Sequence, residues 1–101
     1  MGIKVTRWEY DSATEADLRT KMLSEGLEPY TWSNSPGDRY GAHHHQYDKV
    51  IYVVSGSIRF GLPGSGKTVL LEQGDRLDLP AGIVHDAIVG AQGVHCLEGH
   101  R

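Results

Sequence analysis

The chain of 101 residues has little cysteine, no long apolar run and no cluster of positive charge. Its one cysteine cannot form an internal disulfide, so we expect the reducing environment of the cytoplasm. No segment reaches the ~18 apolar residues of a membrane span, so we expect no membrane association. Ten scattered basic residues against thirteen acidic ones give a net charge of −3, so we expect no nucleic-acid partner.

Glycine is abundant instead, with 13 residues, and strand-forming aromatic residues accompany it. Turn residues recur at short intervals, which is typical of all-β proteins. We expect one domain over residues 1–101, with a strand and a short helix in residues 1–27 and a barrel in residues 28–98. Runs of strand composition lie at Ile3–Trp8, Pro29–Asn34, Tyr40–Gln46, Lys49–Val54, Ser57–Gly61, Thr68–Glu72, Arg76–Leu79, His85–Val89 and Val94–Glu98.

The pattern predicts a helix over Ala13–Glu25. A capping box formed by Ser12 and Glu15 would begin this helix. Leu18 and Met22 would share its apolar face.

Three consecutive histidines stand on a predicted strand. Side chains alternate between the faces of a strand, so His43 and His45 share one face and His44 points the other way. Two imidazoles on one face can converge on one metal ion. Continuing the alternation places Tyr47, Lys49, Ile51 and Val53 on the same inner face, and Asp48 and Tyr52 on the outer face.

Two motifs resemble those of the cupin superfamily. The run His43-x-His45-x3-Lys49, which continues to Gly56, is similar to the first cupin motif, and Gly74-x5-Pro80-x-Gly82-x2-His85 is similar to the second. The resemblance implies an all-β, cupin-type jelly-roll barrel with one short N-terminal helix. It also implies that His43, His45 and His85 form a metal site and that two copies associate as a homodimer.

The sequence departs from the family pattern at Lys49, where the family has a glutamate ligand. Three imidazoles still suit a divalent transition metal such as Fe, Mn, Ni, Cu or Zn. The lysine could turn away to pair with a carboxylate such as Glu98, or it could lose its proton. Alternatively, the pocket holds no metal and binds an anion.

Aromatic and aliphatic side chains predict a pocket for a small molecule. The candidate wall residues are Trp32, Tyr40, Tyr47, Ile51 and Phe60. We expect a mononuclear metalloprotein with dioxygenase-like or isomerase-like chemistry, in which Lys49 is the candidate catalytic residue as a base or as a substrate anchor. The alternative is a non-catalytic cupin module that binds a small molecule or an anion without metal. The sequence does not decide between these two functions.

Residues 61–68 match the phosphate-binding pattern G-x4-G-K-[ST]. That motif needs a following helix, whereas the next residues have strand composition and end at a Gly-Asp turn. We therefore predict a hairpin loop that binds no nucleotide. We expect His95 and His100 on the surface, and Cys96 as a small buried apolar residue.

Overall fold

The computed structural model describes residues 2–9 and 13–101 of the chain. These residues form one helix and seven strands, which confirms the predicted all-β barrel with one N-terminal helix. In order along the chain the elements are β1 (Lys4–Thr6), α1 (Glu15–Ser24), β2 (Tyr30–Asn34), β3 (Arg39–His43), β4 (Lys49–Leu62), β5 (Lys67–Glu72), β6 (Arg76–Leu79) and β7 (His85–His100).

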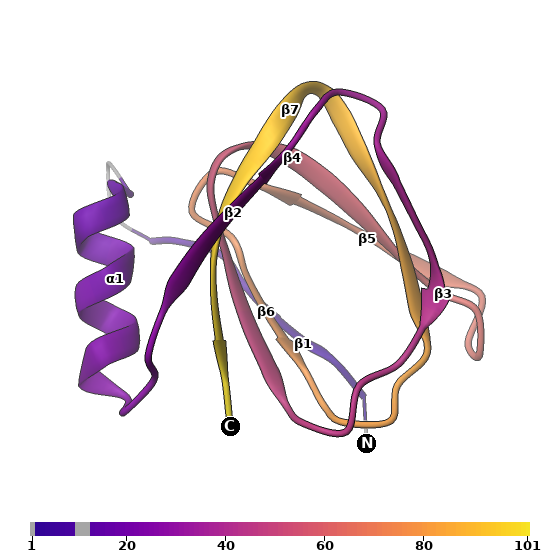
Figure 1. Cartoon of the computed structure of the whole chain (residues 1–101), viewed down its shortest axis with the longest axis horizontal. Helices are drawn as coiled ribbons and strands as arrows, with labels where there is room; N and C mark the ends of the chain where they lie inside the picture. Colours follow the sequence, from indigo (N-terminus) through magenta and orange to yellow (C-terminus); the bar gives the residue numbers. More distant parts are fainter. Residues whose placement is uncertain (1, 10–12) are drawn as a thin grey trace.

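The two long strands β4 and β7 form an antiparallel pair at the centre of the fold. The first part of β4 pairs with β6 and its second part pairs with β5. The start of β7 pairs with β3 and its end pairs with β2, while β1 adds to the free edge of β6. Because the two long strands bend together, the sheet curls into the barrel seen end-on in Figure 1.

Glycines that we expected to end strands lie instead at bends inside β4 and β7. The predicted breaks at Ser55-Gly56 and between Gly90 and Gly93 are therefore wrong. The β4–β7 register shifts on both sides of Gly56, which indicates bulges. Gly56 has φ +77°, and a Cβ atom there would lie 2.0 Å from the carbonyl oxygen of Gly93. The glycines thus let the two strands turn a corner in close contact.

Helix α1 begins two residues later than predicted. Its N-cap is Thr14, whose side chain accepts a hydrogen bond from the Asp17 amide, while the Asp17 carboxylate accepts one from the Thr14 amide. The predicted capping role of Glu15 is wrong, because its side chain pairs with Arg19 and with a histidine of β7. Ser12 lies outside the described residues.

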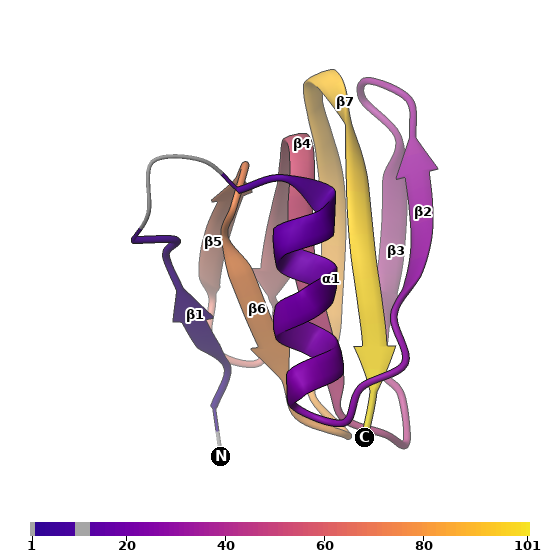
Figure 2. The same cartoon turned by 90° about the vertical axis from the view of Figure 1, so that its left-hand side faces the viewer.

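Helix α1 packs against the outer face of the barrel wall (Figure 2). Leu18 and Met22 are fully buried, as predicted, against Val50, Tyr52 and Leu97 of β4 and β7. A second apolar cluster fills part of the interior: Ile51, Val53, Ile58, Phe60, Leu71, Leu77, Leu79, Ala87, Val89, Val94 and Cys96. The two faces of β4 and β7 therefore contribute to two separate cores.

The predicted hairpin at residues 61–68 is confirmed. Strand β4 ends at Leu62 and β5 begins at Lys67, so the chain continues as a strand where a phosphate-binding loop would need a helix. In the part of the chain that the structure describes, we find no helix of the length and apolar character needed to cross a membrane.

Candidate metal centre

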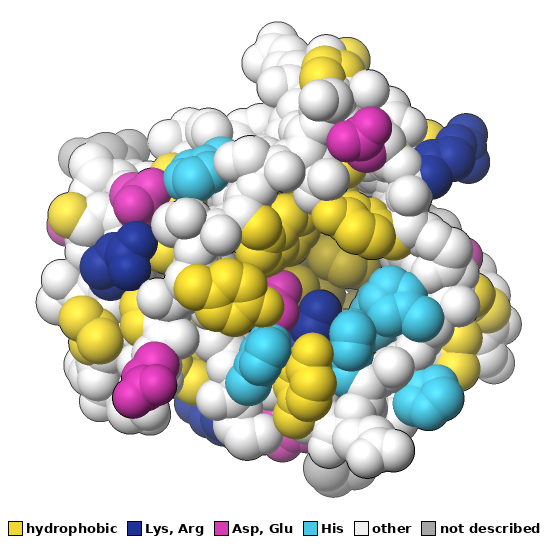
Figure 3. All heavy atoms as spheres, viewed as in Figure 1, with side chains coloured by type: hydrophobic (Ala, Val, Ile, Leu, Met, Phe, Trp, Pro, Cys, Tyr) yellow, Lys and Arg dark blue, Asp and Glu magenta, His cyan; other side chains and the backbone are white. Residues whose placement is uncertain are grey.

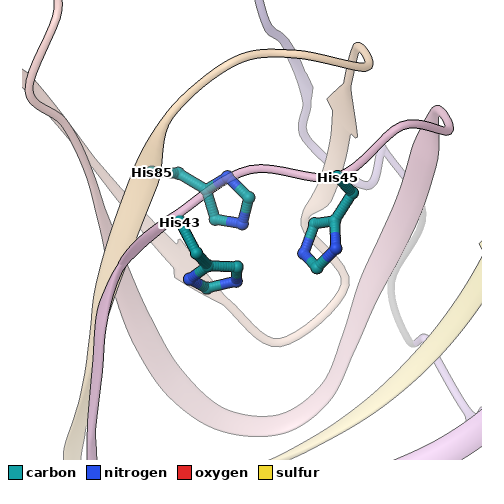
Figure 4. A group of neighbouring side chains, drawn as sticks. All are labelled: His43, His45 and His85. Atoms are coloured by element: carbon teal, nitrogen blue, oxygen red, sulfur yellow. The ribbon is translucent and has the colours of Figure 1, made fainter.

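Three histidines from two segments of the chain meet at one end of the barrel (Figure 4). His43 is the last residue of β3, His45 lies in the loop that follows, and His85 is the first residue of β7. Strand pairing places His43 directly opposite His85. One ring nitrogen from each histidine lies within 4.8 Å of the others, which is close enough to hold one metal ion. His44 is exposed and lies outside this group, as predicted, although the strand expected over Tyr40–Gln46 ends at His43 and strand alternation is therefore not the reason.

Backbone carbonyls fix the orientation of two of these rings. The Nδ1 atom of His43 lies 2.7 Å from the carbonyl oxygen of Gly41, and Nδ1 of His85 lies 2.9 Å from that of Ile83. Because a carbonyl oxygen only accepts hydrogen bonds, Nδ1 carries the proton in both rings. In the tautomer with the proton on Nδ1, the Nε2 atom has a free lone pair, and this is the atom that would bind a metal.

The third ring supplies the observation that tests the fit of a metal. Nδ1 of His45 lies 3.2 Å from the Tyr47 hydroxyl, whereas its Nε2 atom is buried and has no hydrogen-bond partner among the described residues. A buried polar atom without a partner is costly, and a metal ion beside it would remove that cost. Burial lowers the pKa of His45, and the positive charge of Lys49 lowers it further. Burial also lowers the pKa of His85, against the effect of its hydrogen bond to the Ile83 carbonyl. The histidines thus fit a divalent transition metal.

A cavity of about 260 Å³ opens beside the histidines. Its walls include all five predicted residues, Trp32, Tyr40, Tyr47, Ile51 and Phe60. The remaining lining residues are Tyr30, His43, Lys49, Ile58, His85, Ala87 and Glu98. Figure 3 shows this hollow, with histidines and hydrophobic side chains around it and a basic and an acidic side chain within it.

The two charged residues of the cavity form an ion pair. Lys49 Nζ lies 3.5 Å from Oε2 of Glu98, so the lysine makes the carboxylate contact that the sequence suggested. Glu98 also accepts hydrogen bonds from Trp32 Nε1 at 3.1 Å, from the Tyr30 hydroxyl, and from His100 Nε2 at 2.6 Å. Burial raises the pKa of Glu98, but the bonds from Tyr30 and His100 and the charge of Lys49 outweigh it and hold the pKa below its ordinary value. Glu98 is therefore a buried carboxylate with both oxygens occupied.

Comparison with known proteins identifies the family of this barrel. The family model of the cupin domain matches residues 31–99, which is well over half of the chain. The chain is a member of the cupin family. No curated protein matches its sequence.

Solved structures of other proteins have a similar fold. A DUF861-family protein from Thermotoga maritima superposes with a TM-score of 0.67 at 13% identity, over 98% of this chain and 99% of that one. The polyketide cyclase RemF from Streptomyces resistomycificus superposes with a TM-score of 0.65 at 25% identity, over 73% of this chain and 54% of the cyclase. The DMSP lyase DddQ from Ruegeria pomeroyi superposes with a TM-score of 0.66 at 23% identity, over 74% of this chain and 38% of the lyase. This cupin thus spans about half of the cyclase and less than half of the lyase.

The contacts of His100 beside the cavity were not predicted from the sequence. We expected His100 on the surface, and its side chain is partly exposed, but its ring bonds Glu98 and packs against Tyr47 with ring centroids 4.0 Å apart. Residues of one face of β7 alternate, so Cys96, Glu98 and His100 all point to the same side of the strand. That alternation, extended by two residues, would have predicted the contact.

Proposed function

We propose that this cupin is a mononuclear metalloprotein in which Nε2 of His43, His45 and His85 binds a divalent transition metal. The observation that carries the proposal is the buried Nε2 of His45, which has no partner among the described residues, in a ring that lies beside the imidazoles of His43 and His85. The ion would supply a Lewis acid or a redox centre to a molecule in the cavity. Three protein ligands would leave coordination positions open for water and that molecule.

The chain's own residues would position the small molecule. Trp32, Tyr40 and Phe60 provide flat apolar walls that displace water, and the carbonyls of Gly41 and Ile83 hold the imidazoles in place. The names of two neighbours, a polyketide cyclase and a DMSP lyase, denote different reaction classes, so the fold does not select the reaction. Dioxygenase-like and isomerase-like turnover of small organic molecules are the first activities to assay.

A specific observation favours a second function, a binding module without metal. Lys49 brings a positive charge to the same cavity, and that charge opposes a cation at the histidines. In this alternative the cavity binds an anion or a neutral small molecule, and no turnover occurs.

Metal analysis separates the two functions. The protein is purified without nickel resin, because a histidine triplet can itself take up metal from the column, and its metal content is measured by mass spectrometry. The metalloprotein predicts close to one equivalent of one transition metal, or stoichiometric uptake of added zinc. Less than about a tenth of an equivalent, with no uptake of zinc, manganese or iron(II), would favour the metal-free module.

Three further expectations from the sequence stay predictions. They are a homodimer, a cytoplasmic location, and the lack of nucleotide binding at residues 61–68. Sedimentation of the purified protein tests the first. Titration with magnesium-ATP tests the last, where saturable binding that Lys67→Ala removes would overturn the prediction.

A further inference from the structure

In the ion pair of the cavity, the carboxylate of Glu98 accepts several hydrogen bonds, whereas the ammonium of Lys49 is only loosely paired. Glu98 is 3% exposed, and Tyr30, Trp32 and His100 together donate to both of its oxygens. Lys49 lies 3.5 Å from Oε2, which is longer than the roughly 2.8 Å of a charge-assisted hydrogen bond. The carboxylate is therefore stabilised by three other donors, and the ammonium retains donors for another acceptor.

The position of Lys49 leaves those donors facing the cavity. Its side chain is only 13% exposed, so water reaches the ammonium mainly through the cavity that it lines. Ile51 follows on the same face of β4, and the aromatic walls stand around them. A partly desolvated cation beside flat apolar walls is suited to an organic anion, because a carboxylate fills the donors while the rest of the molecule packs on the walls.

The charge of the whole cavity supports the same ligand class. Lys49 and Glu98 contribute one positive and one negative charge to the lining of the cavity. A divalent ion at the histidines would then give the cavity a net positive charge. A negatively charged ligand would offset that charge, so an anionic ligand is favoured over a neutral or cationic one.

We propose that the cavity selects small carboxylic acids with a flat apolar part, and that Lys49 anchors the carboxylate while Glu98 holds the lysine in place. The inference deepens the proposed function, since it names the substrate class of the same site. In this proposal Lys49 binds the carboxylate of the ligand.

Benzoate and its neutral isostere benzamide are the probes that test this proposal. Both are titrated calorimetrically into metal-free and zinc-loaded protein, wild type and Lys49→Gln. We expect wild type to bind benzoate at least tenfold more tightly than benzamide in both forms. Lys49→Gln should weaken the binding of benzoate at least tenfold in both forms and leave the affinity for benzamide unchanged. Lys67→Gln, which alters an exposed lysine of β5, is the matched control and should behave as wild type.

Two more variants guard against a folding defect in Lys49→Gln. Lys49→Arg keeps the charge and should restore most of the preference for benzoate. The double variant Lys49→Gln/Glu98→Gln removes both charges, should remain folded, and should still fail to prefer benzoate.

The outcomes distinguish this inference from the proposed function. Equal binding of the two probes by wild type, or benzoate binding that needs zinc and does not respond to Lys49→Gln, would overturn the anchor while leaving the metal site intact. Failure to take up any metal, with benzoate binding that depends on Lys49, would overturn the metalloprotein and leave the anchor.

Discussion

The outer and inner sides of the barrel wall differ in how completely their polar groups are paired. On the outer side, Arg76 reaches across to Glu25 at the end of α1, with N–O distances of 2.6 and 2.8 Å, and also bonds Asp78 and the Tyr52 hydroxyl. On the inner side, His45 Nε2 has no partner among the described residues. The inner Lys49 is only loosely paired with Glu98.

On the outer side of the barrel wall the polar groups are therefore paired, whereas on the inner side a polar atom among the described residues has no partner and an ion pair is loose. Along β4, Val50 and Tyr52 pack under the helix, while Lys49 and Ile51 line the cavity. Completed hydrogen bonds stabilise a fold, whereas buried polar atoms left without partners mark a place where a ligand completes them. From this contrast we expect outer-face variants to change stability and inner-face variants to change binding.

The largest effect is expected at the outer face. Arg76→Met leaves the carboxylates of Glu25 and Asp78 without their main partner, and should lower the free energy of unfolding by about 3 kcal/mol. Urea denaturation measures this loss. Zinc affinity of the folded variant should equal that of wild type, and Arg59→Met, at an exposed arginine of β4, is the control. A change below about 1 kcal/mol would show that the network contributes little.

In contrast to Arg76→Met, His85→Ala should lower zinc affinity and leave stability nearly unchanged. It removes one of three imidazoles, so zinc affinity measured by competition with a chromophoric chelator should fall by at least about 100-fold. The metal-free variant should unfold close to wild type. His44→Ala changes the exposed member of the histidine triplet and should leave zinc affinity unchanged. Unaltered affinity in His85→Ala would remove His85 from the proposed ligand set.

Tyr47→Phe should give a smaller loss of metal affinity. The Tyr47 hydroxyl lies 3.2 Å from Nδ1 of His45 and would orient that ring, and loss of such a partner typically lowers affinity by 10- to 100-fold. We expect Tyr47→Phe to lower zinc affinity by about tenfold in the same competition assay. Tyr40→Phe is the matched control, because Tyr40 also lines the cavity but its hydroxyl bonds Asn34. Equal affinities for the two variants would contradict this role.

The smallest expected effect is a pH dependence at the outer face. The hydrogen bonds from Arg76 outweigh burial and lower the pKa of Glu25 from 4.5 to about 2. A carboxyl with a lowered pKa in the folded state stabilises the fold fully above its ordinary pKa, and the contribution is lost as pH falls toward the lowered value. The difference in unfolding free energy between wild type and Glu25→Gln should therefore be constant above pH 5 and shrink between pH 4.5 and about 2. A difference that stays constant down to pH 2 would contradict this contribution of Glu25.

Sequence patterns predicted the features that depend on motif spacing. His44 lies apart from His43 and His45 as predicted, although residues 44–48 form a loop and not the expected strand, and the five wall residues line the cavity. The glycines at the strand bends were misassigned, because a positive φ serves a turn and a bulge equally well and only the contact between Gly56 and Gly93 distinguishes them.

The rest depended on tertiary contacts that no single segment reveals. Tyr30 and Trp32 reach Glu98 only because β2 pairs with the far end of β7. Their hydrogen bonds decide that Glu98 is saturated and that Lys49 keeps its donors free, which no spacing in the sequence could show.

X-ray absorption of the zinc-loaded protein tests the central claim most directly, since it counts the ligands of the bound ion. The account predicts three imidazole nitrogens at about 2.0 Å, with the remaining ligands being oxygen, and the loss of one imidazole in His85→Ala. A spectrum with fewer than three imidazoles in wild type, or one that His85→Ala does not change, would contradict the convergence of His43, His45 and His85 on one metal.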